Sequence, residues 1–75
     1  MILYCLHDVK AETWSFPQTT NNVATAVREF EHLAKRPDFP VPDIELCKVA
    51  DFDNLTGGIK VDFQIVLKGS DYAKS

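Results

Sequence analysis

Residues 23–36 read VATAVREFEHLAKR, and this stretch decides the fold. Its apolar residues recur every three or four positions, the spacing of a stripe along one face of an α-helix. They are Val23, Val27, Phe30 and Leu33. Threonine and asparagine side chains at positions 20–22 can cap the first turn, and Pro37 cannot continue the helix. The sequence therefore predicts an amphipathic helix of about four turns.

The segments on both sides of this helix carry the alternating pattern of β-strands. Strands are predicted at residues 2–7, 13–16, 44–52 and 59–68. The alternation breaks near Lys48, which indicates either a bulge there or a sheet that is covered on both faces. In the last strand, Lys60, Gln64 and Lys68 are expected to point outward, opposite the apolar phase that begins at Ile59.

These elements predict an α+β fold of ββαββ order, with a four-stranded antiparallel sheet and one helix packed on one face. Residues 1–68 are expected to form a single α+β domain and residues 69–75 a flexible C-terminal tail. The proline-rich connector at residues 37–43 is expected to be stiff and extended, with Phe39 and Val41 pinning it to the core. The pattern leaves the strand order open.

Length and composition bound the function. A 75-residue chain buries only about 60–65% of its unfolded surface as a monomer, and 45% of its residues are hydrophobic, so a homo-oligomer is expected. The net charge of −3 argues against strong non-specific binding to nucleic acid. No apolar run is long enough to cross a membrane, and the N-terminus does not resemble a signal peptide, so we expect a cytosolic protein without membrane contact.

Catalytic and metal-binding motifs find no support in the sequence. It contains no glycine-rich phosphate loop, and Cys5 and Cys47 lie inside predicted strands, where they behave as small apolar residues. Residues 51–57 faintly resemble a calcium loop, but Leu55 stands where an oxygen ligand belongs, and a hairpin turn explains the same residues. We expect no enzyme, no metal and no cofactor.

Basic residues make nucleic-acid binding the leading alternative to a purely structural role. The candidate nucleic-acid-binding residues are Lys10, Arg28, Lys48, Lys60 and Lys68. The aromatic residues that could stack on bases, if exposed, are Tyr4, Trp14, Phe16 and Tyr72. The competing interpretation is that lysines on an outer strand keep a sheet edge soluble and that the aromatic residues belong to the core.

Several short signatures agree in order and spacing with a known family. They are Tyr4, Asp8-x-Lys10-Ala11-Glu12, Pro17, Ala26-x-Arg28-x-Phe30, Pro42-Asp43-Ile44-Glu45-Leu46 and Phe52-Asp53-x-x-Thr56-Gly57. Over about Met1 to Ile59, this pattern resembles the small nonstructural protein of the gokushoviruses, which are single-stranded DNA bacteriophages of the Microviridae. The family's asparagine-aspartate-proline segment after the helix is replaced here by residues 34–38.

The resemblance implies a phage accessory protein that is made in the host bacterial cytoplasm and is absent from the mature virion. It implies a role in genome synthesis or packaging, by binding single-stranded DNA as an oligomer. The alternative is a protein-interaction module that contacts viral replication or capsid proteins or a host factor. The signature residues also have local explanations: Asp8 can cap the first hairpin turn, and Arg28 can reach Asp8 or Glu12 and hold the hairpin to the helix.

Overall fold

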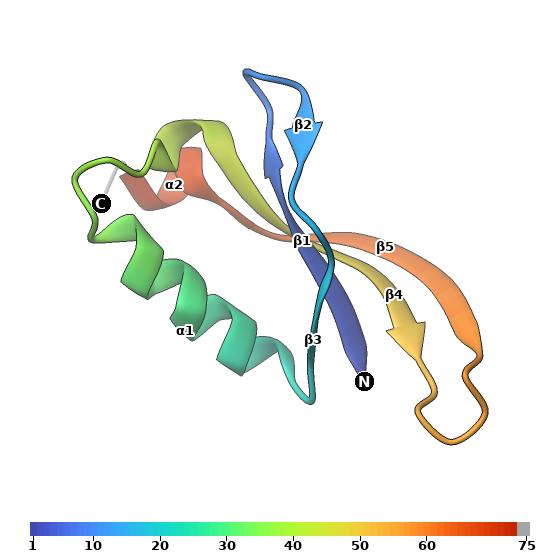
Figure 1. The fold of residues 1–75 in the computed structure, drawn as a ribbon. Helices are drawn as coiled ribbons and strands as arrows, with labels where there is room; N and C mark the ends of the chain where they lie inside the picture. The colour runs from blue at the N-terminus through green and yellow to red at the C-terminus, as the bar shows by residue number, and fades with distance from the viewer. Residues whose placement is uncertain (74–75) are drawn as a thin grey trace.

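The computed structural model describes residues 1–73, and of residues 72 and 73 the backbone alone. The elements in chain order are β1 (Ile2–Asp8), β2 (Thr13–Trp14), β3 (Gln18–Thr20), α1 (Val23–Ala34), the 3₁₀ helix η1 (Val41–Asp43), β4 (Ile44–Phe52), β5 (Ile59–Lys68) and α2 (Gly69–Ala73) (Figure 1). The predicted α+β class and antiparallel sheet are confirmed.

The sheet has five strands in the order β2-β1-β4-β5, and β3 also pairs with β1. The fifth strand arises because the predicted strand at residues 13–16 stops at Trp14 and pairing resumes at Gln18. Between them Pro17 has no N–H to give to the ladder, while Ser15 still exchanges hydrogen bonds with Leu6: its N–H donates to the Leu6 carbonyl and its Oγ accepts from the Leu6 N–H, both at 2.8 Å.

Helix α1 covers one face of the sheet, as predicted (Figure 1). Phe30 is 1% exposed at the centre of this contact. The buried cluster consists of Tyr4, Ala26, Phe30, Ile44 and Leu46. Phe39 packs edge-on against Phe30 with ring centroids 6.0 Å apart, and Val41 is buried, so both residues pin the connector as expected.

Both ends of α1 have local causes. Asn22 caps the first turn, since its Oδ1 accepts a hydrogen bond of 2.9 Å from the Thr25 N–H. The helix ends at Ala34, two residues before the predicted end, and Lys35 is its C-cap. The connector that follows is not extended as predicted, because it contains a turn and then η1, whose first turn accommodates Pro42.

The chain after β5 also differs from the prediction of a tail over residues 69–75. Residues 69–73 form α2, and Gly69 is buried against η1. A side chain at this position would place its Cβ 1.8 Å from the Val41 carbonyl oxygen. Glycine therefore allows the chain to pack here, and residues 74 and 75 lie outside the part that the structure describes.

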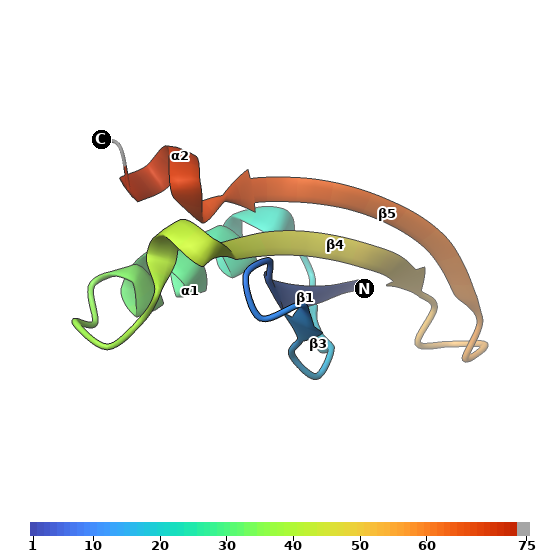
Figure 2. The same ribbon diagram turned by 90° about the horizontal axis from the view of Figure 1, so that it is seen from above.

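Strands β4 and β5 have the predicted bounds, and the predicted bulge near Lys48 is confirmed. The register shifts between Lys48 and Ala50 and again between Leu46 and Cys47. Figure 2 shows these two long strands curving beyond the rest of the sheet, and the molecule measures 40 × 23 × 18 Å.

The apolar phase of β5 is not buried, contrary to its expected orientation. Directly paired residues point to the same side of a sheet, and successive residues point to opposite sides. Because Leu46 packs under α1, its neighbour Cys47 faces away from α1, and Ile65 pairs with Cys47. The β5 residues left exposed are Ile59, Val61, Phe63 and Ile65. This sheet face has no helix on it among residues 1–73.

Candidate nucleic-acid interface

The five predicted nucleic-acid-binding residues do not form one cluster. Lys10 lies in the turn between β1 and β2, Arg28 lies on α1, and Lys48 lies on β4. Lys60 and Lys68 stand near opposite ends of β5, where they pair in register with Asp51 and Glu45. Only part of the predicted set can therefore contact one ligand surface.

Lys48 is held by two carboxylates. Its Nζ lies 2.9 Å from Asp62 Oδ2 and 3.2 Å from Asp51 Oδ2. Hydrogen bonds to Asp62 and, to a smaller extent, to Asp51 raise the pKa of Lys48. The hydrogen bond from Lys48 in turn lowers the pKa of Asp62. The ammonium charge is thus already compensated within the sheet, and a phosphate would have to compete with two carboxylates for it.

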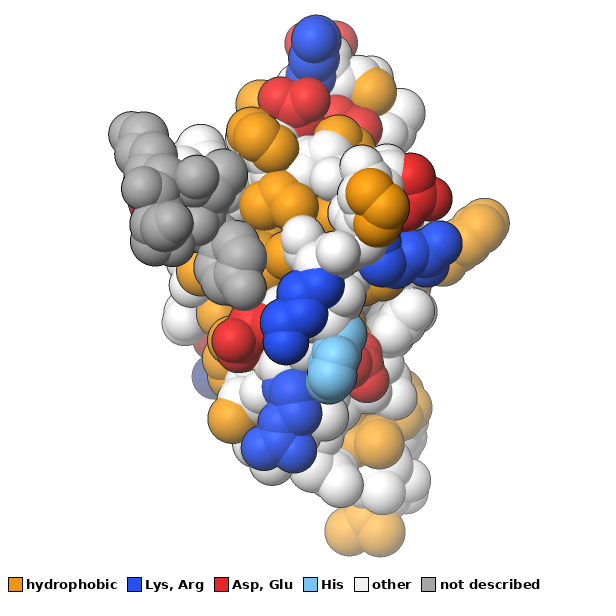
Figure 3. Space-filling view, turned by 90° about the vertical axis from the view of Figure 1, so that its left-hand side faces the viewer, with side chains coloured by type: hydrophobic (Ala, Val, Ile, Leu, Met, Phe, Trp, Pro, Cys, Tyr) orange, Lys and Arg blue, Asp and Glu red, His pale blue; other side chains and the backbone are white. Residues whose placement is uncertain are grey.

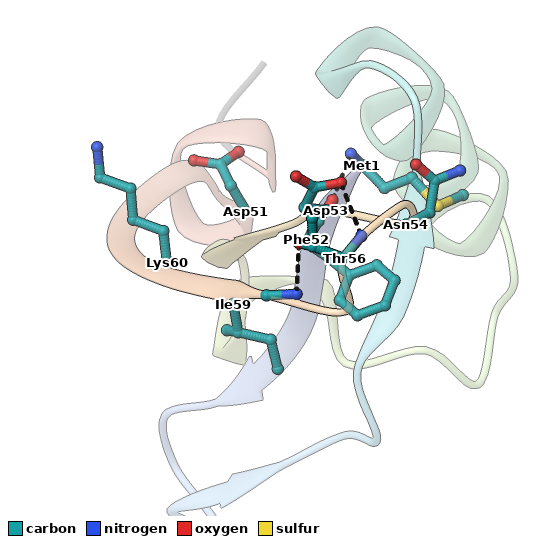
Figure 4. Close-up of a pocket in the computed structure, with 9 residues that line it drawn as sticks. Met1, Asp51, Phe52, Asp53, Asn54, Thr56, Ile59 and Lys60 are labelled. Atoms are coloured by element: carbon teal, nitrogen blue, oxygen red, sulfur yellow. Dashed lines mark hydrogen bonds between the residues drawn. The ribbon is translucent and has the colours of Figure 1, made fainter.

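A shallow basin lies at the turn end of the β4–β5 hairpin (Figure 4). It is lined by Met1, Asp51, Phe52, Asp53, Asn54, Thr56, Gly58, Ile59 and Lys60. The carboxylates of Asp51 and Asp53 stand at its wall with two cations, Lys60 and the N-terminal ammonium of Met1, which donates a hydrogen bond of 2.8 Å to the Phe52 carbonyl. A phosphate backbone would meet as many carboxylates as cations there, so the basin offers it no net attraction and is a poor nucleic-acid site.

Asp53 has a structural role in the hairpin turn. Its Oδ1 accepts hydrogen bonds from the Leu55 N–H at 2.9 Å and the Thr56 N–H at 3.4 Å, and these bonds lower the pKa of its carboxyl group. Gly57 adopts the positive φ of +77° that the turn requires. The hairpin interpretation of residues 51–57 is therefore confirmed. In the part of the chain that is described, no three His, Cys, Asp or Glu side chains are grouped so that they could hold a metal ion.

The outer face of α1 carries an aligned set of basic side chains. Arg28, His32 and Lys35 follow one another at i, i+4 and i+7, so they lie along one side of the helix. All three are exposed, and within residues 1–73 neither Arg28 nor Lys35 forms an ion pair. We call these three residues the basic stripe. Figure 3 views this side of the molecule and shows basic side chains above and below a histidine, with acidic groups beside them.

Two neighbours modify the charge of the basic stripe. Arg36 Nε lies 3.5 Å from Asp38 Oδ1, so this arginine is partly compensated by an exposed ion pair. Glu31 lies on the same side of the helix, three residues after Arg28 and four before Lys35. The stripe is therefore a modest positive surface that can contact a few phosphates.

Glu29 faces the sheet instead of the basic stripe. The Tyr4 hydroxyl donates a hydrogen bond to the Glu29 carboxylate and lies 2.9 Å from Gln18 Oε1. This contact joins the helix to the hairpin, whereas the sequence predicts that Arg28 with Asp8 or Glu12 makes that connection. Asp8 instead caps the first turn, as predicted, by accepting from the Ala11 N–H at 2.9 Å.

The Tyr4 contact makes a prediction about alkaline stability. Burial, and then the hydrogen bond and charge of Glu29, raise the pKa of Tyr4 to about 12. An unfolded tyrosine titrates near pH 10, so the folded state resists deprotonation, and this stabilisation is complete below pH 10 and is lost as the pH rises through about 12. The free energy of unfolding should fall by about 2–3 kcal/mol more in the wild type than in Tyr4→Phe over this range.

Urea titrations at a series of pH values between neutrality and pH 12 measure this difference. Tyr4→Phe keeps the ring in the core, and the other alkaline groups, including Lys48, titrate in both proteins. Parallel stability curves for the two proteins would show that Tyr4 does not supply the loss.

The aromatic candidates for base stacking lie in different environments. Tyr4 is buried and cannot stack on a base, whereas Phe16 is exposed. Trp14 stacks on His7 with ring centroids 3.9 Å apart and meets Phe63 edge-on at 6.1 Å. These contacts lie on the sheet face opposite α1, away from the basic stripe. The side chain of Tyr72 lies outside the described part of the structure.

Cys5 and Cys47 are paired directly across β1 and β4, and both are free and buried. Burial, with smaller effects of Glu45 and Cys5, raises the pKa of Cys47 to about 11. Burial also raises the pKa of Cys5. Both thiols are therefore protonated near neutral pH, which agrees with the prediction that they act as small apolar residues.

The fold and this surface define a small α+β protein with a row of exposed basic side chains along its helix, and the family comparison identifies it as a phage protein. The sequence model of the family described as Phage ORF5 protein matches residues 1–72, and the chain belongs to that family. No curated protein and no solved structure matches the chain. Along residues 1–73, the structure has no helix that is long and apolar enough to cross a membrane.

Sequence reasoning included Arg28 among the candidates but missed His32 and Lys35. The signal was present, because the three residues repeat at helical spacing on the polar face of the predicted helix. The alternation of β5 predicts its outward-facing lysines more directly, since it is the most regular strand pattern in the chain.

Proposed function

We propose that this phage protein is a non-enzymatic accessory protein that binds single-stranded DNA through the basic stripe of α1. Its role would be in genome synthesis or packaging in the cytoplasm of the infected bacterium, outside the mature virion. The gokushovirus signatures in the sequence support the choice of single-stranded DNA, since those phages carry such genomes. The chain's family supports the wider class of phage protein.

The observation that carries the proposal is the exposure of two unpaired cations on one rigid element. Arg28 and Lys35 stand on the same side of a packed helix, and no carboxylate within residues 1–73 pairs with either of them. Lys48, by contrast, is held by Asp51 and Asp62. Cations that are free in the unbound protein contact phosphates without first breaking an ion pair.

Fluorescence anisotropy with a labelled single-stranded oligonucleotide tests the proposal at two salt concentrations. The wild type should bind saturably at low salt and lose affinity as salt rises. The double variant Arg28→Gln/Lys35→Gln should bind about tenfold more weakly at low salt. Its plot of log affinity against log salt should be flatter by about 1.4, since each phosphate contact on a single strand contributes about 0.7.

The matched control is Lys60→Gln/Lys68→Gln, which removes the same charge from β5. Its affinity should stay within about threefold of that of the wild type. Lysines that contact no phosphate act on the DNA only at long range, where salt ions screen them. Equal losses in the two double variants would refute the basic stripe as the site. No saturable binding by the wild type at low salt would refute single-stranded DNA as the ligand.

A further inference from the structure

The sheet face opposite α1 is apolar and open to solvent. Its exposed side chains include Trp14, Ile59, Val61, Phe63 and Ile65, with exposed fractions between 45% and 79%. A shallow hollow on this face is lined by Cys5, Trp14, Val49 and Phe63. We call these seven residues the open face. Large apolar groups gathered on one side of a small protein are costly to leave in water.

The open face is large enough for a protein contact. Two of its five exposed residues have aromatic side chains, which offer about 150–250 Å² each when fully exposed, and three are aliphatic and somewhat smaller. At their exposed fractions the five together present on the order of 500 Å² of apolar surface. Two such faces in contact would remove on the order of 1,000 Å² from water, the area at which specific interfaces begin. The internal core, by comparison, has only three large side chains that are fully buried among residues 1–73: Phe30, Leu46 and Cys47.

The charge distribution favours a second copy of this chain as the occupant. A twofold dimer places the same patch against itself, so the patch must not repel its own image. The seven residues of the open face are uncharged. At its border His7 Nδ1 lies 3.2 Å from Glu45 Oε1, and Lys68 pairs in register with the same glutamate. A nucleic acid would need cations on this face, and the seven residues supply none.

We infer that two copies of the protein pack their open faces together in a twofold dimer, with Phe63 and Trp14 near its centre. Each sheet then has a covering on both sides: α1 on one and the partner's sheet on the other. The two α1 helices lie on the outer surfaces of this dimer. The contact uses a different side of the molecule from the basic stripe, so this inference does not depend on DNA binding.

Sedimentation equilibrium across a dilution series, combined with tryptophan emission, tests the dimer. Trp14 is the single tryptophan of the chain and lies on the open face, so its emission reports this contact directly. The wild type should dissociate on dilution, with a red shift of emission at the same midpoint as the change in mass. Val61→Asp should raise the dissociation constant by about 100-fold or more, because each dimer would bury two unpaired carboxylates.

Val61 is 79% exposed, so its substitution should leave the fold intact, which circular dichroism would verify. Val61→Lys tests the same site with the opposite charge and should weaken the dimer equally. The matched control is Leu55→Asp in the β4–β5 turn, also an exposed aliphatic residue but outside the open face; it should change the dissociation constant by less than about threefold. Three results would overturn the inference. They are a wild type that is monomeric at all concentrations, a dimer whose dissociation constant changes with neither Val61 substitution, and a monomer that associates only with another phage protein.

Discussion

Replacing Phe30 with alanine is expected to unfold a large fraction of the protein. The Phe30 side chain is 1% exposed; it extends from α1 to the sheet and packs against the Phe39 ring. Truncating a buried phenylalanine costs about 3–5 kcal/mol, from lost burial and the cavity that remains. A 75-residue domain has a total stability of roughly 4–11 kcal/mol, so the loss is comparable with the whole.

Urea denaturation followed by circular dichroism measures this change in the free energy of unfolding. Glu31→Ala is the matched control, since it truncates the neighbouring helical residue on the exposed side and should change stability by less than about 0.5 kcal/mol. If Phe30→Ala proved as mild as Glu31→Ala, α1 could not be anchored to the sheet through this ring.

The helix and the long strands were predictable because their patterns are local. The apolar side chains of α1 repeat over several turns, and Asn22 and Pro37 mark its ends to within three residues. The bounds of β4 and β5 follow from their alternation and from the Asp53–Gly57 turn. In each case the period and the breaking residues lie within the element itself, so the wider fold is not needed to read them.

The orientation of β5 was not predictable, because it depends on register. Two bulges, one between Leu46 and Cys47 and one near Lys48, decide which side of β5 meets the helix. A shift of one residue moves every side chain to the other face, and a single sequence does not show how two strands are aligned. For the same reason, the structure was needed to find that Asp51 and Asp62 both contact the Lys48 ammonium.

In the candidate site, too, the features within one element were predictable from the sequence and the contacts between elements were not. Arg28, His32 and Lys35 could be aligned from helical spacing alone, because one element carries them all. Which cations are free and which are paired depends on contacts between strands far apart in sequence. The partner of Tyr4 was equally hidden, since Glu29 lies 25 residues away on the helix.

Replacing Gly69 with alanine is expected to destabilise the protein strongly, although the change adds only one methyl group. Gly69 joins β5 to α2 at a buried position against η1. An added Cβ would lie 1.8 Å from the Val41 carbonyl oxygen and 2.5 Å from that of Ile44. These are backbone atoms, so no side-chain rotation relieves the overlap, and α2 must move away from η1 at a cost of about 3 kcal/mol.

Chemical denaturation gives the change in stability, and amide hydrogen exchange shows where the structure opens. Exchange should accelerate first in α2 and η1, because the clash lies between them. Gly58→Ala is the matched control: its Cβ would meet only the Thr56 Oγ1, at 3.2 Å, and this hydroxyl can rotate away at the loss of one exposed hydrogen bond from the residue 58 N–H. It should cost less than about 1 kcal/mol. The packing of α2 against η1 is the reason why residue 69 cannot accept a methyl group. If the two alanine variants lost equal amounts of stability, α2 would therefore not be packed against η1.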